Sequence, residues 1–320
     1  MTQILQPQDL KKAVKIIKCG GLVAFPTETV YGLGANARNQ KAVRKVFAVK
    51  KRARNNPLHL NIANVNWINE LEKKNPLIVQ KIMDTFWPGP LTIILPLKEK
   101  TLPKEITGNL TTAGFRMPKN ETALALIRAV GIMVGPSANL SGNFSPTKSK
   151  HVLSDFDGKI DAILEDDRNL SGLESTILDV SNLARPQILR PGIITKEMLE
   201  VFLPNVQLLE SKNHYRFNVS VVIIDQQKQN WQKAIAWAKD KKKKIGLLAD
   251  REIIKKLIKQ VDKAYVLTEN NDLNLAAKRL FSGLRALNES RPFLDVIFAQ
   301  NFPGEGLALA YRNRLLRICQ

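Results

Sequence analysis

The sequence is poor in cysteine, histidine and long apolar runs. Its 320 residues include two cysteines, Cys19 and Cys319, and three histidines. Two cysteines cannot form the disulfide framework of a secreted domain, and His59, His151 and His214 form no ligand cluster with them. No apolar stretch approaches the roughly 18 residues of a membrane span, and the amino terminus lacks a signal-peptide pattern. We therefore expect a cytoplasmic protein without a structural metal or a membrane partner.

Acidic residues are scarce relative to basic ones. The chain has 49 lysines and arginines against 29 aspartates and glutamates, which gives a net charge of +20. A field of this sign attracts polyanions such as nucleotides and RNA. A compositional bias of the genome also raises lysine content without any selected contact. The charge therefore leaves a weak contact with RNA or tRNA open but does not establish it.

The second half of the chain has a regular pattern. Short apolar runs alternate with helices of 3.6-residue periodicity, which predicts parallel βαβ units in a small Rossmann-like domain over residues 219–320. The expected strands are Val219–Asp225, Ile245–Asp250, Ala264–Thr268 and Asp295–Gln300. No G-x-G-x-x-G follows the first strand, so dinucleotide binding is not indicated. Residues 203–218 have no clean periodicity, and we expect a linker there.

Residues 1–202 predict a different domain, a mixed α/β sheet with long functional loops. A helix is expected before Gly20 and Gly21, because such glycines suit a carboxy-terminal helix cap. The strands that follow have irregular spacing and many prolines at their ends. They are expected at Leu22–Phe25, Leu91–Leu97, Ala113–Met117, Ile132–Gly135, Asp161–Leu164, Ser175–Val180 and Gln187–Leu189.

Four polar stretches in this half are candidates for chemistry. They are FPTETVYGLGANA from Phe25, KKRARNNP from Lys50, GPSANLSGNFSPT from Gly135, and the pair ESTI and ILRPG. Their cations, hydroxyls and backbone amides suit a phosphate chain and a small zwitterion. Any one of them alone is more typical of a turn, and the cations after Lys50 also suit a helix carboxyl end. GNFSPTKS has Thr147 where a phosphate-binding P-loop needs its second glycine, so that motif is excluded.

Together and in this order, these blocks resemble the YrdC-like domain of threonylcarbamoyl-AMP synthases. The blocks NPL, WPGPLT and RMP add to the resemblance. The HY in the linker, LFSGLRALNE and GEGLALAYRNRL resemble the carboxy-terminal extension of the long members. The resemblance implies a YrdC-like mixed twisted sheet domain followed by a smaller Rossmann-like parallel α/β domain.

The resemblance also implies a reaction. Such enzymes condense L-threonine, bicarbonate and ATP, which carries Mg²⁺, into threonylcarbamoyl-AMP and release pyrophosphate. A separate transferase then uses the product to modify the adenosine 3′ of the anticodon in tRNA. This chemistry needs alignment and charge neutralisation more than a covalent nucleophile. That requirement agrees with motifs that are rich in cations and poor in histidine.

Residue roles follow from the same resemblance. The residues expected to bind threonine are Thr27, Tyr31, Asn61, Thr112, Arg116 and Ser175. Arg116 is expected to pair with the carboxylate of threonine. The residues expected to bind ATP are Lys50, Arg52, Ser137, Asn139, Ser145, Arg190 and Tyr215. Tyr215 lies in the linker and is expected to close over the nucleotide as a lid. No general base and no metal ligand are assigned.

The chain departs from the family pattern at two points. It reads NPLHLNI where many members read NPLIVHI, so Asn61 stands where a histidine is expected. His59 is two residues earlier and would share the same strand face, which leaves it as an alternative replacement for that histidine, although we expect a surface histidine there. The linker SKNHYRFN keeps His214 and Tyr215 without the usual proline.

Two other functions are alternatives. An RNA-binding module agrees with the net charge, but it would not need the buried PSAN and ESTI stretches. A carbamoyl-adenylate enzyme of hydrogenase maturation resembles the YrdC-like region but carries zinc-finger and acylphosphatase-like domains that this sequence does not show. The second half is also compatible with a docking module for the partner transferase.

Overall fold

The computed structural model describes residues 1–72, 76–98, 102–167, 170–209, 215, 217, 219–225, 227–290 and 292–318. The chain divides into two compact units. The first comprises Met1–Ser141, Ser145–Leu170 and Glu174–Ser211, and the second Gly142–Phe144, Ser171–Leu173 and Lys212–Gln320. The domain boundaries expected from the sequence do not foresee the two short segments of the second unit.

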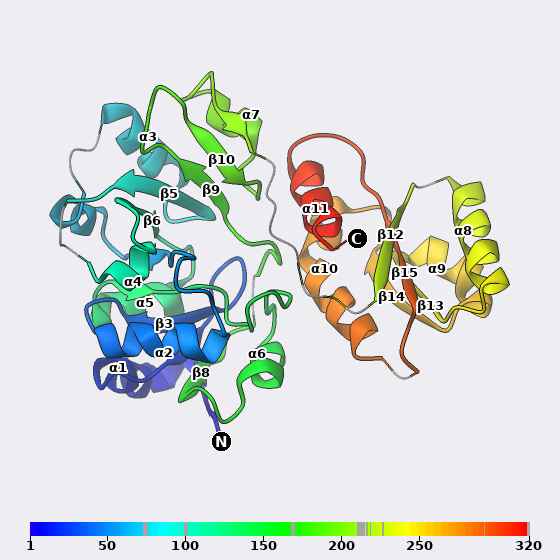
Figure 1. Ribbon diagram of the computed structural model, residues 1–320, viewed down its shortest axis with the longest axis horizontal. Helices are drawn as coiled ribbons and strands as arrows, with labels where there is room; N and C mark the ends of the chain where they lie inside the picture. Colours follow the sequence, from blue (N-terminus) through cyan, green and yellow to red (C-terminus); the bar gives the residue numbers. More distant parts are fainter. Residues whose placement is uncertain are drawn as a thin grey trace. The chain divides into compact units, whose positions relative to one another are not determined.

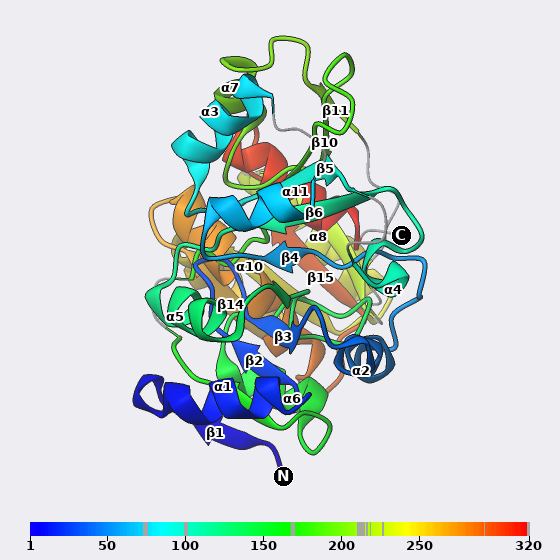
Figure 2. The same cartoon turned by 90° about the vertical axis from the view of Figure 1, so that its left-hand side faces the viewer.

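The first unit is built on a mixed sheet of eleven strands in the described part of the chain, in the order β1-β8-β2-β3-β7-β4-β6-β5-β9-β10-β11 (Figure 1). Figure 2 shows these strands rising from β1 near the amino terminus to β11. The strands are β1 (Gln3–Leu5), β2 (Val23–Phe25), β3 (Gly32–Asn36), β4 (Leu60–Asn61), β5 (Leu91–Pro96), β6 (Thr112–Arg116), β7 (Met133–Val134), β8 (Ala162–Leu164), β9 (Thr176–Asp179), β10 (Gln187–Arg190) and β11 (Gln207–Leu208).

The helices of the first unit are α1 (Leu10–Lys18), α2 (Gln40–Lys50), α3 (Leu77–Phe86), α4 (Lys104–Thr107), α5 (Glu121–Val130), α6 (Ser149–Phe156) and α7 (Lys196–Glu200), with 3-10 helices at Pro7–Asp9 and Val65–Glu70. The Asn39 side chain caps α2 by accepting a hydrogen bond from the Ala42 amide. The apolar face of α2 buries Val43, Val46 and Phe47. The helix therefore packs on the core up to its last residue, which fixes the chain that follows it.

The expected mixed sheet is confirmed, but some strands were missed. No strand was expected within the polar stretch that begins at Phe25, but it contains β3, a buried strand that pairs antiparallel with β2. Two of its five residues are glycines, so the sequence of β3 is not typical of a strand. Gly34 is needed for packing, because an added carbon there would lie 3.0 Å from the Phe25 ring. β11 lies in the expected linker and pairs parallel with β10, so that prediction is wrong for Gln207–Leu208. Residues 210–214, 216 and 218 of that segment lie outside the described residues.

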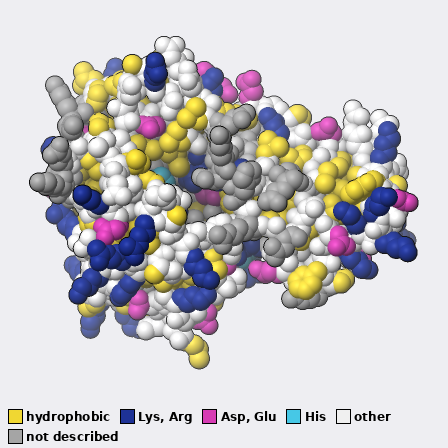
Figure 3. Space-filling model, viewed as in Figure 1, with side chains coloured by type: hydrophobic (Ala, Val, Ile, Leu, Met, Phe, Trp, Pro, Cys, Tyr) yellow, Lys and Arg dark blue, Asp and Glu magenta, His cyan; other side chains and the backbone are white. Residues whose placement is uncertain are grey.

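The first unit carries exposed lysines on two neighbouring parts of its surface. Figure 3 shows Lys and Arg side chains gathered over α1 and α2. The exposed lysines of these helices include Lys11, Lys12, Lys15, Lys41 and Lys45. Part of the net positive charge is therefore concentrated on this surface.

The second unit confirms the expected parallel βαβ arrangement. Its described sheet has the order β12-β15-β13-β14, with all pairs parallel. The strands are β12 (Ser220–Ile224), β13 (Ile245–Asp250), β14 (Lys263–Thr268) and β15 (Val296–Gln300), and the helices are α8 (Lys228–Asp240), α9 (Arg251–Leu257), α10 (Leu273–Asn288) and α11 (Leu307–Leu316), with a 3-10 helix at Ile258–Gln260. Helices α8 and α9 share one apolar core with the sheet and α10 and α11 another, so both faces are covered (Figure 1).

The core of the second unit is completed by the two short segments from earlier in the chain. The Phe144 ring centroid lies 4.9 Å from that of Phe217, 5.4 Å from Tyr215 and 6.0 Å from Phe281. Gly172 lies so close to α10 that an added carbon would be 2.4 Å from a main-chain oxygen. None of the helices in the described ranges is long and apolar enough to cross a membrane.

Candidate active site

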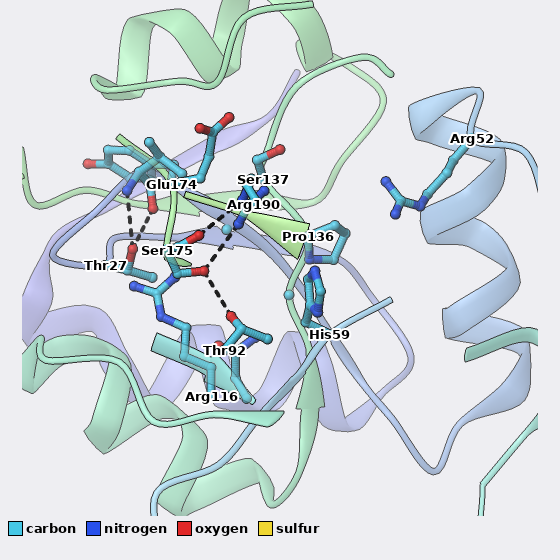
Figure 4. A pocket seen from close by; sticks show the side chains of 15 residues that line it. Thr27, Arg52, His59, Thr92, Arg116, Pro136, Ser137, Glu174, Ser175 and Arg190 are labelled. Carbon is cyan, nitrogen blue, oxygen red and sulfur yellow. Dashed lines mark hydrogen bonds between the residues drawn. The ribbon is translucent and has the colours of Figure 1, made fainter. Parts of the chain in front are cut away.

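A polar pocket lies in the first unit, on the central strands of its sheet (Figure 4). Its lining comes from the connection between β2 and β3 with the first residue of β3, the segments after α2 and after β7, the residues just before β4 and β9, and the strands β4, β5, β6 and β10. The lining residues are Thr27, Val30, Tyr31, Gly32, Arg52, His59, Asn61, Thr92, Arg116, Gly135, Pro136, Ser137, Glu174, Ser175 and Arg190. Eight of the thirteen predicted binding residues are among them: Thr27, Tyr31, Asn61, Arg116, Ser175, Arg52, Ser137 and Arg190.

One end of the pocket is organised around Arg116, at the end of β6. Its terminal nitrogen donates a hydrogen bond to Thr29 Oγ1 at 2.8 Å and lies 2.9 Å from a carboxylate oxygen of Glu28. The Thr27 hydroxyl fixes this loop, because it donates to the Val30 carbonyl at 2.6 Å and lies 2.9 Å from Thr29 Oγ1. Arg116 Nε has no hydrogen-bond partner among the described residues. A buried guanidinium held in this way suits a ligand carboxylate.

The other side of the pocket is built on β9 and β10. Arg190 Nε donates to the Ser175 carbonyl at 3.0 Å, and a terminal nitrogen donates to the Ser175 hydroxyl at 3.1 Å. The Ser175 hydroxyl lies 2.8 Å from Thr92 Oγ1 on the neighbouring strand β5. This chain of hydrogen bonds, marked in Figure 4, holds Arg190 in one orientation toward the pocket.

A third guanidinium comes from the segment after α2. Arg52 donates to Asn56 Oδ1 at 2.6 Å and to the Pro57 carbonyl at 2.7 Å. Burial lowers the pKa of Arg52 to about 10, so the side chain remains a cation at neutral pH. The pocket therefore has three fixed positive groups, Arg52, Arg116 and Arg190, which suits an anionic ligand with several phosphates and a carboxylate.

Lys50 is placed behind the lining of the pocket. Its side chain is 1% exposed, and its Nζ donates to the main-chain oxygens of Ser137 and Asn139. Burial, and to a smaller extent Arg52, lower the pKa of Lys50 to about 7. Lys50 and Asn139 thus support the loop that presents Ser137, rather than lining the pocket themselves.

Tyr31 shapes the pocket wall and is held by acidic residues on its far side. Its hydroxyl donates to Asp167 Oδ1 at 2.6 Å and accepts from the Asp166 amide at 2.9 Å. Burial, together with the hydrogen bond to Asp167, raises the pKa of Tyr31 above its ordinary value. The phenol therefore stays protonated at neutral pH.

His59 lies in the pocket, so the prediction of a surface histidine is wrong. It is one residue before β4 and shares a strand face with Asn61, as the period of two requires. Glycines make room for both side chains: an added carbon would lie 2.5 Å from His59 Nδ1 at Gly114 and 2.2 Å from Asn61 Nδ2 at Gly135. Burial, and then the charges of Arg190, Arg52 and Arg116, lower the pKa of His59 to about 3. Asn61 is 3% exposed, and its Nδ2 has no hydrogen-bond partner in the described chain.

Three further predicted binding residues lie elsewhere. Thr112 begins β6, four residues from Arg116, and is about 13 Å away along an extended strand. Ser145 donates to the Glu174 carboxylate at 2.7 Å and so contacts a lining residue instead of lining the pocket. Tyr215 is 8% exposed in the core of the second unit. The roles assigned to these residues stay predictions.

Besides His59, three polar residues at the site were not assigned from the sequence. Thr92 and Glu174 line the pocket, and Glu28 pairs with Arg116. All three belong to blocks that the sequence singled out, WPGPLT, ESTI and FPTETVYGLGANA. Polar side chains inside those blocks were therefore the available signal. Among the described residues, no group of three or more histidine, cysteine, aspartate or glutamate side chains is placed to hold a metal ion.

The fold and the site define a two-unit α/β protein whose pocket is built to hold an anionic small molecule. Comparison with known families agrees with this class. A family model described as "Telomere recombination" matches residues 15–192, and one described as "Threonylcarbamoyl-AMP synthase, C-terminal domain" matches residues 194–318. The chain belongs to the threonylcarbamoyl-AMP synthase family.

Relatives match over nearly the whole chain. The threonylcarbamoyl-AMP synthase of Bacillus subtilis is 36% identical over 323 residues, which covers 96% of this chain and 92% of the relative. That of Pyrococcus abyssi is 35% identical over 326 residues, with the same coverage. The crystal structure of P. abyssi Sua5 complexed with L-threonine has a TM-score of 0.89 at 33% identity and covers 99% of this chain and 97% of that one.

Proposed function

We propose that this protein forms L-threonylcarbamoyladenylate and pyrophosphate from L-threonine, bicarbonate and ATP. The observation that carries the proposal is the pocket itself, in which three fixed guanidinium groups surround hydroxyl and amide side chains in a member of this family. Such a pocket neutralises a carboxylate and a triphosphate at the same time, which is what this condensation requires.

The threonine end is formed by the loop before β3 and the strands β4 and β6. Arg116 pairs with the substrate carboxylate, and Asn61 Nδ2 donates to a substrate oxygen. Thr27, Tyr31 and Ser175 complete the walls. The P. abyssi structure is a complex with L-threonine, which supports threonine as a substrate of this fold.

The ATP end is formed by Arg52, Arg190 and Ser137, with Lys50 and Asn139 behind them. The arginines spread the charge of the phosphates, which lowers the barrier to attack at the α-phosphorus. The lining offers cations and hydroxyls with one carboxylate, Glu174, among the described residues, so Mg²⁺ would be held mainly by the ATP phosphates. When bound, the ion supplies further neutralisation of the phosphate charge.

The product serves a transferase that modifies tRNA. The threonylcarbamoyl-adenylate is a mixed anhydride, so its acyl group is activated for transfer to the adenosine. The exposed lysines on α1 and α2 support a weak electrostatic contact with tRNA, whose affinity would fall steeply with salt.

The test is pyrophosphate release by the purified protein with ATP and Mg²⁺, with threonine and bicarbonate supplied together and then omitted singly. Release that requires both substrates is expected. Arg190→Gln should raise the KM for ATP about tenfold or more, because the loss of a charge-assisted contact costs on the order of 1.5–3 kcal/mol. The exposed Arg128 of α5 provides the matched control, since Arg128→Gln changes the net charge equally outside the pocket.

Two results would contradict the proposal. One is ATP turnover that is the same with and without threonine. The other is an absence of pyrophosphate release by a protein that still binds tRNA tightly, which would favour an RNA-binding module.

A further inference from the structure

Carbamate formation releases a proton inside the pocket. Threonine arrives as an ammonium ion, and its reaction with bicarbonate forms one N–C bond and yields the carbamate, one water and one proton. The carbamate oxygen then attacks the α-phosphorus and pyrophosphate leaves. Some group must accept the proton before nitrogen can attack carbon. Which group accepts this proton is a question that rests on the proposed function.

We propose that His59 accepts the proton of the threonine amine. Its imidazole lies in the pocket (Figure 4), and it directly precedes β4, which pairs in parallel with β6, the strand that ends in Arg116. If Arg116 holds the carboxylate, the amino group is only one carbon away from it. Asn61, on the same strand face as His59, presents its Nδ2 as a donor to the same ligand.

The shape of the sheet supports a dedicated place for this imidazole. A side chain at Gly114 would occupy the space of the His59 ring, because an added carbon would lie 2.5 Å from Nδ1. The main chain at His59 is fixed as well, since its carbonyl accepts a hydrogen bond from the Gly135 amide at 3.2 Å. The ring therefore lies against Gly114 of β6, and the main chain that carries it is held by the residue after β7.

The other ionisable groups of the described lining are less suited to the task. Arg52, Arg116 and Arg190 are cations and cannot accept a proton. The Tyr31 hydroxyl is engaged with Asp167 and Asp166. Glu174 accepts a hydrogen bond from Ser145, and Glu28 pairs with Arg116 outside the lining. His59 is the neutral base among these groups, and Glu174 is the competing candidate.

Binding of the substrates would raise the affinity of the His59 imidazole for a proton. In the free protein burial, and then the three arginines, keep the imidazole neutral, so one ring nitrogen carries no proton at neutral pH. A triphosphate and a carboxylate bound to those arginines cancel their positive field and add a negative one. The affinity of the imidazole for a proton must then rise, because nearby anions favour the charged form. Proton acceptance is thereby coupled to occupancy of both subsites.

The first test is kinetic. His59→Gln keeps a hydrogen-bonding side chain but cannot take up a proton, and it should lower kcat about 100-fold with a small change in KM for threonine. Its remaining rate should rise about tenfold per pH unit, since only threonine already unprotonated in solution can react, whereas the wild-type rate levels off. The double variant His59→Gln with Asn61→His returns an imidazole to the same face and should recover part of the rate and the plateau.

The second test needs no turnover. The chain has three histidines, so NMR can follow the His59 ring signal, assigned with the His59→Gln protein. We expect no titration between about pH 5 and pH 8 in the free protein. α,β-Methylene ATP with L-threonine, in the absence of bicarbonate, should bring a titration into that range. His151, which lies outside the pocket lining, serves as the internal reference.

The proposal is overturned if His59→Gln retains the wild-type rate and pH profile, or if the His59 signal does not respond to the two ligands. The role would belong to Glu174 instead if Glu174→Gln, and not His59→Gln, lost rate and kept a remaining rate that rises about tenfold per pH unit. Failure of the proposed function is distinguishable, because the wild-type protein would then release no threonine-dependent pyrophosphate.

Discussion

At the scale of single residues, Arg116 and Glu28 form a largely buried ion pair at the pocket. Their side chains are 11% and 14% exposed, so the charges are largely removed from water. Replacing Arg116 with Gln leaves Glu28 buried without its counter-ion, and breaking such a pair costs about 3–5 kcal/mol. We expect Arg116→Gln to lower the free energy of unfolding by about that amount and to raise the KM for threonine at least tenfold.

The double variant separates the two effects. Glu28→Gln with Arg116→Gln should recover most of the stability, because no unpaired charge remains, but it should not recover threonine affinity. Chemical unfolding and substrate titration measure the two quantities independently. Recovery of threonine affinity in the double variant would show that Arg116 does not bind the substrate.

Lys50 makes a pH-dependent contribution to stability. Its pKa is about 7 in the folded protein, against about 10.5 in the unfolded chain. Between these values the unfolded chain holds one more proton, so the free energy of unfolding falls as the pH falls, by up to about 1.4 kcal/mol per pH unit, and levels off below pH 7. Urea unfolding should give a larger free energy of unfolding at pH 9 than at pH 7 in the wild-type protein, and this difference should be absent from Lys50→Met.

Lys41 offers the control for Lys50 on the same helix. It is exposed, so Lys41→Met should keep the wild-type pH dependence. An identical pH dependence in all three proteins would mean that the Lys50 ammonium is not destabilised by its burial.

At the scale of the elements, the pocket depends on glycines beside β4, Gly114 in β6 and Gly135 directly after β7. Gly135→Ala would place a carbon 2.2 Å from Asn61 Nδ2, which must move. We expect a stability loss of about 1–3 kcal/mol and a threonine KM raised at least several-fold, because the amide is displaced in the pocket. Gly158→Ala is the control: its φ of 70° makes it strained by about 1–2 kcal/mol, but its added carbon meets nothing within 4 Å.

Thermal unfolding and threonine titration of the two variants decide this point. If both variants lose similar stability and only Gly135→Ala has a raised KM for threonine, the contact between Gly135 and Asn61 supports the threonine end. An unchanged KM in Gly135→Ala would show that Asn61 does not contribute to the threonine end.

Some elements could be predicted from the sequence because their own residues determine them. β13 and β15 are fully buried apolar runs between amphipathic helices, which is the pattern of a parallel α/β sheet. β4 and β11 are two residues long, and β3 contains two glycines, so none has a local strand signal. These strands form because neighbouring strands pair with them, which only the tertiary structure supplies.

At the scale of the whole molecule, the second unit needs residues from far earlier in the chain. Phe144 is 4% exposed in its core, and its carbonyl accepts a hydrogen bond from Arg285 on α10. Phe144→Ala should therefore destabilise β12 to β15 by about 3–5 kcal/mol, although it lies beside the pocket motifs in the sequence. Hydrogen exchange should show the loss of protection in the second unit.

The aromatic pair of Phe86 and Phe202 provides the counterpart in the first unit. Their ring centroids lie 5.8 Å apart, so Phe86→Ala removes a comparable contact there. Its effect on hydrogen exchange should fall on α3 and α7 instead. Faster exchange confined to the first unit in Phe144→Ala would contradict the division of the chain described above.

The pocket as a whole was only partly predictable. Arg116, Thr27 and Arg190 were assigned through the resemblance. Arg116 and Arg190 come together because β6, β5, β9 and β10 are neighbours in the sheet, and Thr27 reaches them from the connection between β2 and β3. No local sequence pattern predicts that strand order. The position of His59 in the pocket could not be predicted either, because it depends on the space left by Gly114 on β6 and not on the residues next to His59 in the sequence.

The most direct measurement is detection of the product itself. The purified protein is incubated with ATP, Mg²⁺, L-threonine and ¹³C-labelled bicarbonate, and the nucleotides are analysed by mass spectrometry under conditions that limit hydrolysis. The account predicts threonylcarbamoyl-AMP that carries the label, together with an equal amount of pyrophosphate, and far less of both with Arg116→Gln. Pyrophosphate without a labelled adenylate, or a labelled adenylate formed equally without threonine, would contradict it.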